Sequence, residues 1–181
     1  MERSKRSKAE STSHIRKSLG LHSSLLYGLN DTFRQHHVSY GSMVETVLCA
    51  GVVSRVSSVL QRDVKQFGKQ FLFDRKEETC WNSDQGSSQW ITLELPHKVC
   101  ISEIHIQFQG GFSSRSCILE GCLKECELEK IAEFYPEDNN ALQKFDFPEK
   151  YVEKLRLSFP SSTDFFGRII VYQLDLLGQK K

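Results

Sequence analysis

Residues 74–96, DRKEETCWNSDQGSSQWITLELP, contain the pattern that decides the fold class. An acidic and polar stretch leads to Thr-Cys-Trp, and a second Trp then opens a strand in which apolar and polar residues alternate. In WITLELP the residues Ile91, Leu93 and Leu95 fall on one face, because successive side chains of a strand point to opposite sides. Pro96 is expected to end the strand, because Pro donates no hydrogen bond to a neighbouring strand. The stretch therefore predicts a half-buried strand entered from a polar turn.

Other segments repeat this alternation over most of the chain after residue 42. Three of them place their apolar residues on one face, namely ISEIHIQFQ at 101–109, KLRLSF at 154–159 and RIIVYQLDLLG at 168–178, and a first strand is expected within CAGVVSRVSSVL at 49–60. Residues 117–135 also suit a helix, but Gly121 and the alternation around Ala132 favour strands. Half-buried strands without helices between them predict an all-β fold of antiparallel sheets packed as a sandwich.

The chain divides by composition into a basic first part and an acidic second part. It has 181 residues, of which 39% are hydrophobic, enough for one buried core. Seven of its 24 Lys and Arg, but only three of its 23 Asp and Glu, lie in residues 1–42. This segment is poor in apolar residues, and we expect a disordered tail; a nuclear-import patch at KRSK (5–8) and an organellar transit peptide are alternatives. Residues 43–181 are expected to form one domain, and Met43 is also a candidate translation start.

The composition of residues 43–181 argues against two classes of partner. Binding of nucleic-acid phosphates needs a face of clustered Lys and Arg, whereas here the basic residues alternate with more numerous acidic ones. No run approaches the roughly 18 apolar residues of a membrane span. We therefore expect an intracellular protein without direct nucleic-acid binding and without a membrane partner.

The six cysteines, at positions 49, 80, 100, 117, 122 and 126, are expected to be free thiols in a reducing compartment. Cys117, Cys122 and Cys126 are candidate zinc ligands by proximity in sequence. However, no fourth Cys or nearby His completes a tetrahedral set. Ordinary core or strand cysteines are therefore the preferred interpretation.

Patterns of catalytic residues are not found in the sequence. It lacks Gly-x-Ser-x-Gly and a glycine-rich phosphate loop, and no obvious nucleophile accompanies His97 or His105. We therefore expect a binding module rather than an enzyme.

The segments VSRVSSVL, FGKQFLFDRKEETCWNSDQGSSQWITLELP and ISEIHIQF together resemble the first half of a discoidin, or coagulation-factor type C, domain. RIIVYQLDLLG is similar to the last strand of that family. The resemblance covers nearly all of residues 48–178 and implies a galactose-binding-like jelly-roll β-sandwich, in agreement with the alternation.

The discoidin resemblance also implies a structural calcium ion beside the quoted stretch. By position, Asp74, Thr79 and Asp175 are its candidate side-chain ligands, and oxygen donors suit calcium. The usual Asp-Gly-Asp of the family is here Asp74-Arg75-Lys76, so neutralisation of Asp74 by a neighbouring cation is the alternative. A domain without any cofactor is the preferred expectation.

The motifs SRVSSVL, EETCWNSDQGSSQW, IQFQGGFSSR, FYPEDNN and TDFFGR, in this order, are similar to those of a small family of nuclear proteins that associate with an orphan nuclear receptor. This resemblance implies a partner, the orphan receptor, and a function, repression of transactivation by hindering the receptor from binding its DNA response element. It also implies a nuclear location, with the cytoplasm as a second one. A lectin-like module that binds a carbohydrate or small ligand is the alternative function.

Two loops are the best candidates for recognition, because each follows a strand and combines aromatic residues with an Arg, the residue types enriched as interface anchors. The candidate binding residues are Phe112, Arg115, Asp164, Phe165, Phe166 and Arg168. The alternative is that the Phe rings close the end of the sandwich and that Arg168 pairs with Asp164. For Trp81 and Trp90, burial in the core is the preferred expectation; the alternative is stacking on a sugar, with Asn82 and Asp84 as hydrogen-bond partners of its hydroxyls.

Overall fold

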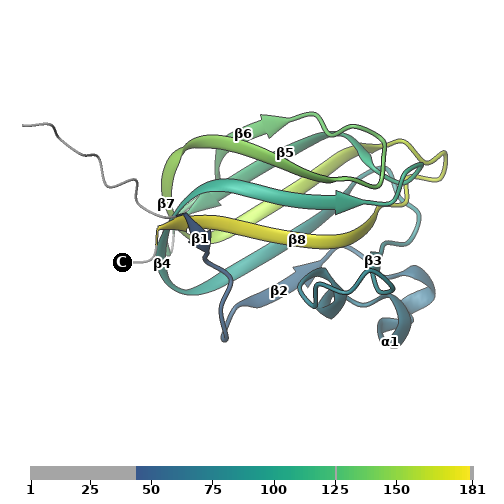
Figure 1. Ribbon diagram of the computed structural model, residues 1–181, viewed down its shortest axis with the longest axis horizontal. Helices are drawn as coiled ribbons and strands as arrows, with labels where there is room; N and C mark the ends of the chain where they lie inside the picture. Colours follow the sequence, from purple (N-terminus) through teal and green to yellow (C-terminus); the bar gives the residue numbers. More distant parts are fainter. Residues whose placement is uncertain (1–43, 125, 180–181) are drawn as a thin grey trace, which may run out of the picture. The chain divides into compact units, whose positions relative to one another are not determined.

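The computed structural model describes residues 44–124 and 126–179 of the chain (Figure 1). The expectations of a disordered tail over residues 1–42 and of a start at Met43 lie outside the described residues. Within the described part, no helix is long and apolar enough to cross a membrane.

The described residues form mainly antiparallel strands. In chain order the elements are β1 (Glu45–Thr46), β2 (Val53–Val56), the 3-10 helix η1 (Leu60–Arg62), α1 (Val64–Phe67), the 3-10 helix η2 (Lys69–Leu72), β3 (Trp81–Asn82), β4 (Gln89–Phe108), β5 (Ser114–Cys122), β6 (Glu129–Phe134), β7 (Leu142–Ser162) and β8 (Ile170–Gln179). The all-β prediction is confirmed.

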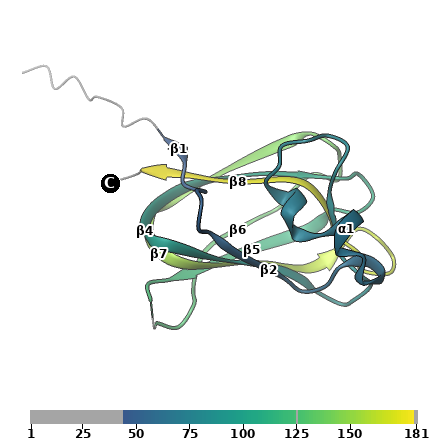
Figure 2. The same ribbon diagram turned by 90° about the horizontal axis from the view of Figure 1, so that it is seen from below.

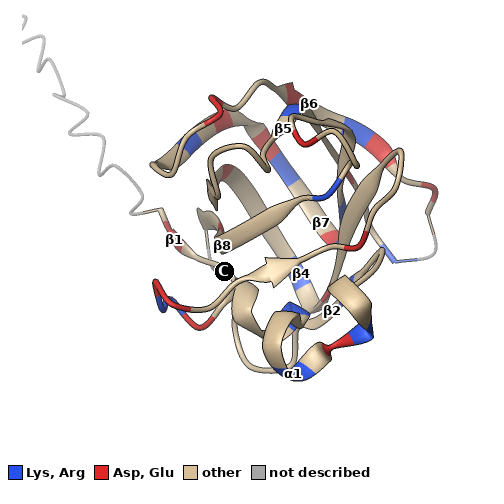
Figure 3. Cartoon of the chain, turned by 90° about the vertical axis from the view of Figure 1, so that its right-hand side faces the viewer, with Lys and Arg blue, Asp and Glu red and all other residues tan. Residues whose placement is uncertain are grey.

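The strands form two layers. The long strands β4 and β7 belong to both, since each passes from one layer into the other. In the first layer, the first half of β4 pairs with β2 and with the second half of β7. This half of β7 pairs with β5, and β5 pairs with β6. The second half of β4 pairs with the first half of β7 and with β8, and β8 also pairs with β1 and β3. Figure 3 shows these strands surrounding a common interior.

The core lies between the two layers and is built from the residues that the alternation placed inward. Ile91 and Leu93 from one layer, and Ile104 and Leu174 from the other, line the same small internal void. Trp81 is fully buried and its indole N–H donates to the carbonyl of Ser58 at 3.0 Å, which confirms its expected place in the core.

Two local predictions differ from the structure in detail, and a third is confirmed. The strand expected at 49–60 is confined to β2, and the residues after it form the short helices η1, α1 and η2; the first turn of α1 is capped by the Asp63 carboxylate. Pro96 does not end its strand. It lies within β4 where the pairing with β7 is interrupted between Glu94 and Val99, so no hydrogen-bond donor is needed there. The strands favoured over a helix at 117–135 are confirmed as β5 and β6.

Candidate binding surface at the loop end of the sandwich

Four connections gather at the end of the sandwich where β8 begins (Figures 1 and 2). They are residues 83–88, 109–113, 135–141 and 163–169, and we call this region the loop end. Backbone hydrogen bonds join the connections directly, from Gly86 N to Phe166 O at 3.1 Å and from Thr163 N to Ser113 O at 2.9 Å. The loop end is therefore one connected surface.

The turn at 163–168, which we call the aromatic turn, is organised by the carboxylate of Asp164. This carboxylate accepts the backbone N–H groups of Phe166 and Arg168, both at 3.1 Å, and the guanidinium of Arg168 at 3.3 Å and 3.4 Å. Burial alone would raise the pKa of Asp164, but these hydrogen bonds and the Arg168 charge hold it below its ordinary value. The turn is thus fixed by four donors to one side chain.

The aromatic turn presents two phenyl rings to solvent. Phe165 is 92% exposed and Phe166 is 57% exposed, and their rings meet edge to face with centroids 5.2 Å apart. In the described residues Phe165 is the most exposed of the large hydrophobic side chains. These two rings therefore do not close the end of the sandwich.

The other predicted binding residues lie around this turn. The Arg168 guanidinium stacks over the half-buried ring of Phe112 at 4.8 Å. The exposed Arg115 donates to the carbonyl of Ser162 at 3.3 Å. The structure thus brings Phe112, Asp164, Phe165, Phe166, Arg168 and, at its margin, Arg115 to one surface. It also contains the alternative pairing of Arg168 with Asp164.

A second carboxylate, that of Asp138, joins the connection 135–141 to the aromatic turn. It accepts the N–H of Gly111 and the hydroxyl of Ser113, each at 2.8 Å, and the hydroxyl of Thr163 at 3.2 Å. Burial opposes ionisation, but these donors lower the pKa of Asp138 below its ordinary value. Three of the four connections are therefore held by one side chain.

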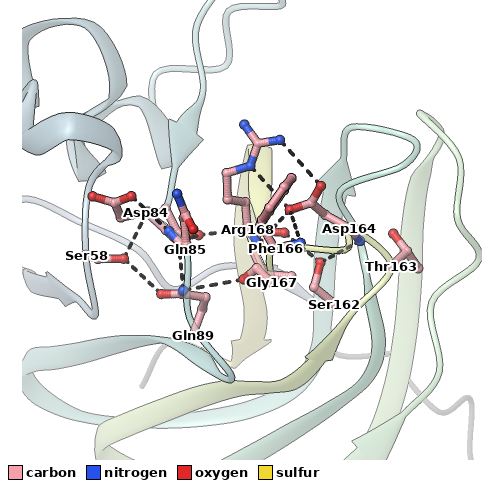
Figure 4. A network of polar contacts seen from close by, with 12 residues as sticks. Ser58, Asp84, Gln85, Gln89, Ser162, Thr163, Asp164, Phe166, Gly167 and Arg168 are labelled. Carbon is pink, nitrogen blue, oxygen red and sulfur yellow. Dashed lines mark hydrogen bonds and ion pairs between the residues drawn. The ribbon is translucent and has the colours of Figure 1, made fainter.

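The fourth connection is held by Gln89, which the sequence analysis did not single out (Figure 4). This side chain is 3% exposed; its amide N–H groups donate to the carbonyls of Asp84 and Gly167, and its oxygen accepts the hydroxyls of Ser57 and Ser58. The alternation in β4 contained the signal, because the parity that places Ile91 inward also places Gln89 inward.

Close backbone contact fixes the aromatic turn against residues 83–88. Gly167 has a φ of +77°, and a Cβ atom at this position would stand 1.9 Å from the carbonyl oxygen of Gly86. Only Gly fits such a contact in a left-handed conformation.

A hollow of about 540 Å³ lies beside the exposed rings. Its lining combines hydroxyl and amide groups with the two phenyl rings, and includes Gln85, Ser87, Ser161, Ser162, Phe165 and Phe166. The aromatic turn is therefore bordered by a polar recess rather than by a continuous apolar surface.

The tryptophans do not contribute an exposed sugar platform at this end. Trp81 is buried, and Trp90 is half-buried with the Arg156 guanidinium 5.0 Å above its ring. Asn82, considered as a sugar ligand together with Asp84, is only 7% exposed.

The three proposed calcium ligands are divided between two separate sets of contacts. Asp74 accepts the Thr79 hydroxyl at 2.7 Å and the N–H of Lys76 at 3.1 Å. Asp175 instead accepts the guanidinium of Arg75 at 2.8 Å. A metal ion at Asp175 would face this like charge, so the arrangement does not fit calcium.

The three cysteines considered for zinc differ in their surroundings. Cys117 is fully buried in the core, where burial raises the pKa of its thiol, whereas Cys126 is exposed. Among the residues that the structure describes, no group of three His, Cys, Asp or Glu side chains is placed to hold a metal ion.

Comparison with known proteins identifies relatives over most of the sandwich. A family model described as "Sad1 / UNC-like C-terminal" matches residues 55–180. Nuclear receptor 2C2-associated protein of Xenopus laevis is 71% identical over 136 residues, which are 75% of this chain and 100% of the relative. The chain belongs to both of these families. The human nuclear receptor 2C2-associated protein is 56% identical over 138 residues, 76% of this chain and 99% of its own length.

Solved structures show the fold in more distant proteins. An F5/8 type C domain from Bacteroides fragilis aligns with a TM-score of 0.66 at 15% identity, over 78% of this chain and 99% of that domain. A family 32 carbohydrate-binding module from Clostridium perfringens, solved with galactose, aligns with a TM-score of 0.62 at 15% identity, over 75% and 99% of the two chains. The discoidin-like jelly-roll prediction is confirmed.

Proposed function

We propose that this protein is a non-enzymatic interaction module that binds an orphan nuclear receptor through the aromatic turn. By this binding it represses transactivation, because it hinders the receptor from reaching its DNA response element. Its place of action is the nucleus, with the cytoplasm as a second location.

The receptor as partner is supported by the relatives. Curated relatives with 56% to 71% identity carry the name nuclear receptor 2C2-associated protein, so association with nuclear receptor 2C2 is the first interaction to test. The name describes association and not a reaction, which agrees with the lack of a catalytic motif in the sequence.

The observation that carries the placement of the interface is the exposure of Phe165 and Phe166 on a turn that is already ordered. Burying a Phe side chain stabilises a complex by roughly 1.5–3 kcal/mol, and aromatic residues are enriched among the few that dominate binding energy. The Asp164 contacts hold the turn before binding, so little conformational entropy is lost when a partner docks.

Repression by occlusion agrees with the charges of the domain. Acidic and basic residues are interspersed over the loop end (Figure 3), and such a surface does not attract nucleic-acid phosphates. We therefore infer that the protein acts by contacting the receptor and not by competing for the DNA itself.

The test is a binding measurement between the full-length chain and purified nuclear receptor 2C2, with Phe165→Ala/Phe166→Ala as the variant. The dissociation constant is expected to rise at least about tenfold, since truncation of a dominant interface aromatic costs roughly 2 kcal/mol or more. Tyr151→Ala is the matched control, because Tyr151 is an aromatic residue, 37% exposed, on β7 opposite Cys100 and away from the loop end.

The same proteins also test the mechanism. In a gel-shift assay the wild type is expected to decrease the receptor–DNA complex, and the double variant is not. A folded double variant that binds as tightly as the wild type would refute this interface, and a wild type that does not bind the receptor would refute the function.

The hollow beside the aromatic turn favours one alternative, a lectin-like module. Hydroxyl and amide groups next to a phenyl ring are the groups that bind sugars, and the C. perfringens neighbour was solved with galactose. Saturable binding on a glycan array that Phe165→Ala/Phe166→Ala abolishes would favour this alternative over receptor binding.

A further inference from the structure

The carboxylate of Asp175 is a buried charge that the chain itself neutralises. Asp175, on β8, is 8% exposed and accepts the Arg75 guanidinium at 2.8 Å, the Thr46 hydroxyl, and the N–H of Leu176 at 2.9 Å. An unpaired carboxylate at this depth would destabilise the fold, because burial penalises the charged form. Arg75 supplies the positive charge that this position requires.

The backbone holds Arg75 in an uncommon conformation. Its φ is +57°, in the left-handed region that residues other than Gly rarely adopt. Asp74, directly before it, accepts the Lys76 N–H and the Thr79 hydroxyl, so the turn is closed on itself while the Arg75 side chain reaches β8. Such strain persists where surrounding contacts compensate for it, and the pair with Asp175 is such a contact.

We propose that the Arg75 guanidinium is the resident cation of this site and takes the role that a bound metal ion would otherwise have. A guanidinium and a divalent ion compete for one carboxylate, because each would place a positive charge beside the other. A hollow of about 380 Å³ lies beside the pair and is lined in part by Thr46, Arg75 and Asp175. Folding of the domain is therefore independent of calcium.

The pair also explains how segments distant in sequence are joined at this edge. Arg75 precedes β3 and Thr46 is on β1, and both donate to the carboxylate of Asp175 on β8. A covalently attached cation makes this junction permanent, whereas a metal ion would make it depend on the ion concentration.

The test is thermal unfolding of the full-length chain in millimolar calcium and in excess chelator. The wild-type melting temperature is expected to be the same in both, within about 1 °C, since a ligand that does not bind the native state adds no stability. Arg75→Ala is expected to lower it by about 4 °C, because loss of one partner leaves a buried charge. Asp175→Asn in the Arg75→Ala background is expected to restore at least half of this loss.

Lys76→Ala is the matched control, because it removes an adjacent positive charge from the same turn; its melting temperature is expected to stay within about 1 °C of the wild type, as for most surface substitutions. A saturable rise of the wild-type melting temperature with calcium would overturn the proposal. Equal effects of Arg75→Ala and Lys76→Ala would also overturn it. The calcium measurement needs no variant, so it decides the question even if Arg75→Ala does not fold.

Discussion

Two Arg–Asp pairs with similar chemistry contribute differently to this domain. In both, the aspartate side chain is 11% exposed. Asp164 and Arg168 are four residues apart in one turn, whereas Arg75 and Asp175 are 100 residues apart. The first pair organises a surface turn that displays Phe165, and the second joins strands of the fold.

Since the two aspartates are equally buried, we expect the effect of losing each pair to depend on the segments that the pair joins. A local pair orders a few residues, so its loss changes a surface. A pair between distant segments joins elements that come together only when the domain folds, so we expect its loss to affect global stability. The predictions below test this division, beginning with the largest expected effect.

Gly167→Ala is expected to have the largest effect, although it changes a single surface turn. A Cβ atom there would stand 1.9 Å from the Gly86 carbonyl oxygen, and the φ of +77° is unfavourable for Ala. We expect the free energy of unfolding to fall by about 3 kcal/mol or more, the sum of a left-handed conformation and a backbone collision. Urea unfolding monitored by Trp fluorescence measures this loss.

Gly111→Ala is the matched control for Gly167→Ala. Gly111 has a φ of +84°, and nothing lies within 4 Å of the position of a Cβ atom. It therefore has the conformational strain without the collision, for which we expect a loss of about 1–2 kcal/mol. Equal losses for the two substitutions would mean that the contact with Gly86 does not hold the turn.

Gln89→Leu is expected to have the next largest effect. The substitution keeps an inward side chain but leaves the carbonyls of Asp84 and Gly167 without the amide donor that they share. Leaving buried polar groups unpaired costs about 1–3 kcal/mol, which urea unfolding will detect. Gln107→Leu is the control, because Gln107 makes its hydrogen bond to Asn140 at an exposed position and is expected to change stability by less than about 0.5 kcal/mol.

A smaller effect is expected from acid, through Asp138 and Asp164. Both have a pKa below the ordinary value in the folded protein, so each stabilises the fold above the pKa of the unfolded chain. This contribution is lost as the pH falls through the ordinary carboxyl range towards the lowered values. Melting temperatures between neutral pH and about pH 3 are expected to decline less steeply in Asp138→Asn and Asp164→Asn than in the wild type; parallel curves would contradict this assignment.

The sequence predicted the parts of the fold that depend on periodicity. The inward positions of Ile104, Leu155 and Leu174 follow from two-residue alternation, and all three are buried. The alternation does not reveal where a ladder can be interrupted, so Pro96 was mistaken for the end of a strand. It also does not distinguish a strand from the short helices at residues 60–72, which have too few residues for a helical period.

The candidate site was predicted in part. Aromatic residues next to an Arg pointed to Phe165 and Arg168, because such combinations recur at interfaces. The partners that hold them, Asp138 and Gln89, come from other connections, and sequence alone does not show which loops meet at one end. The same limit applies to Asp175, whose partner Arg75 is 100 residues away. The calcium ligands were predicted from their positions in the sequence, and these positions do not reveal that Arg75 contacts Asp175.

Phe165→Ala is expected to have the smallest effect on stability. Its contrast with Phe112→Ala tests whether the aromatic turn serves binding rather than folding. Because the ring is 92% exposed, its removal is expected to change the free energy of unfolding by no more than about 0.5 kcal/mol. Phe112→Ala, at the half-buried ring under Arg168, is expected to cost about 1 kcal/mol, a typical value for a point substitution. If Phe165 serves recognition, its substitution weakens receptor binding without lowering stability. A clear loss of stability in Phe165→Ala would instead show that the exposed ring supports the fold of the aromatic turn. Phe165 would then contribute to stability and not to recognition alone.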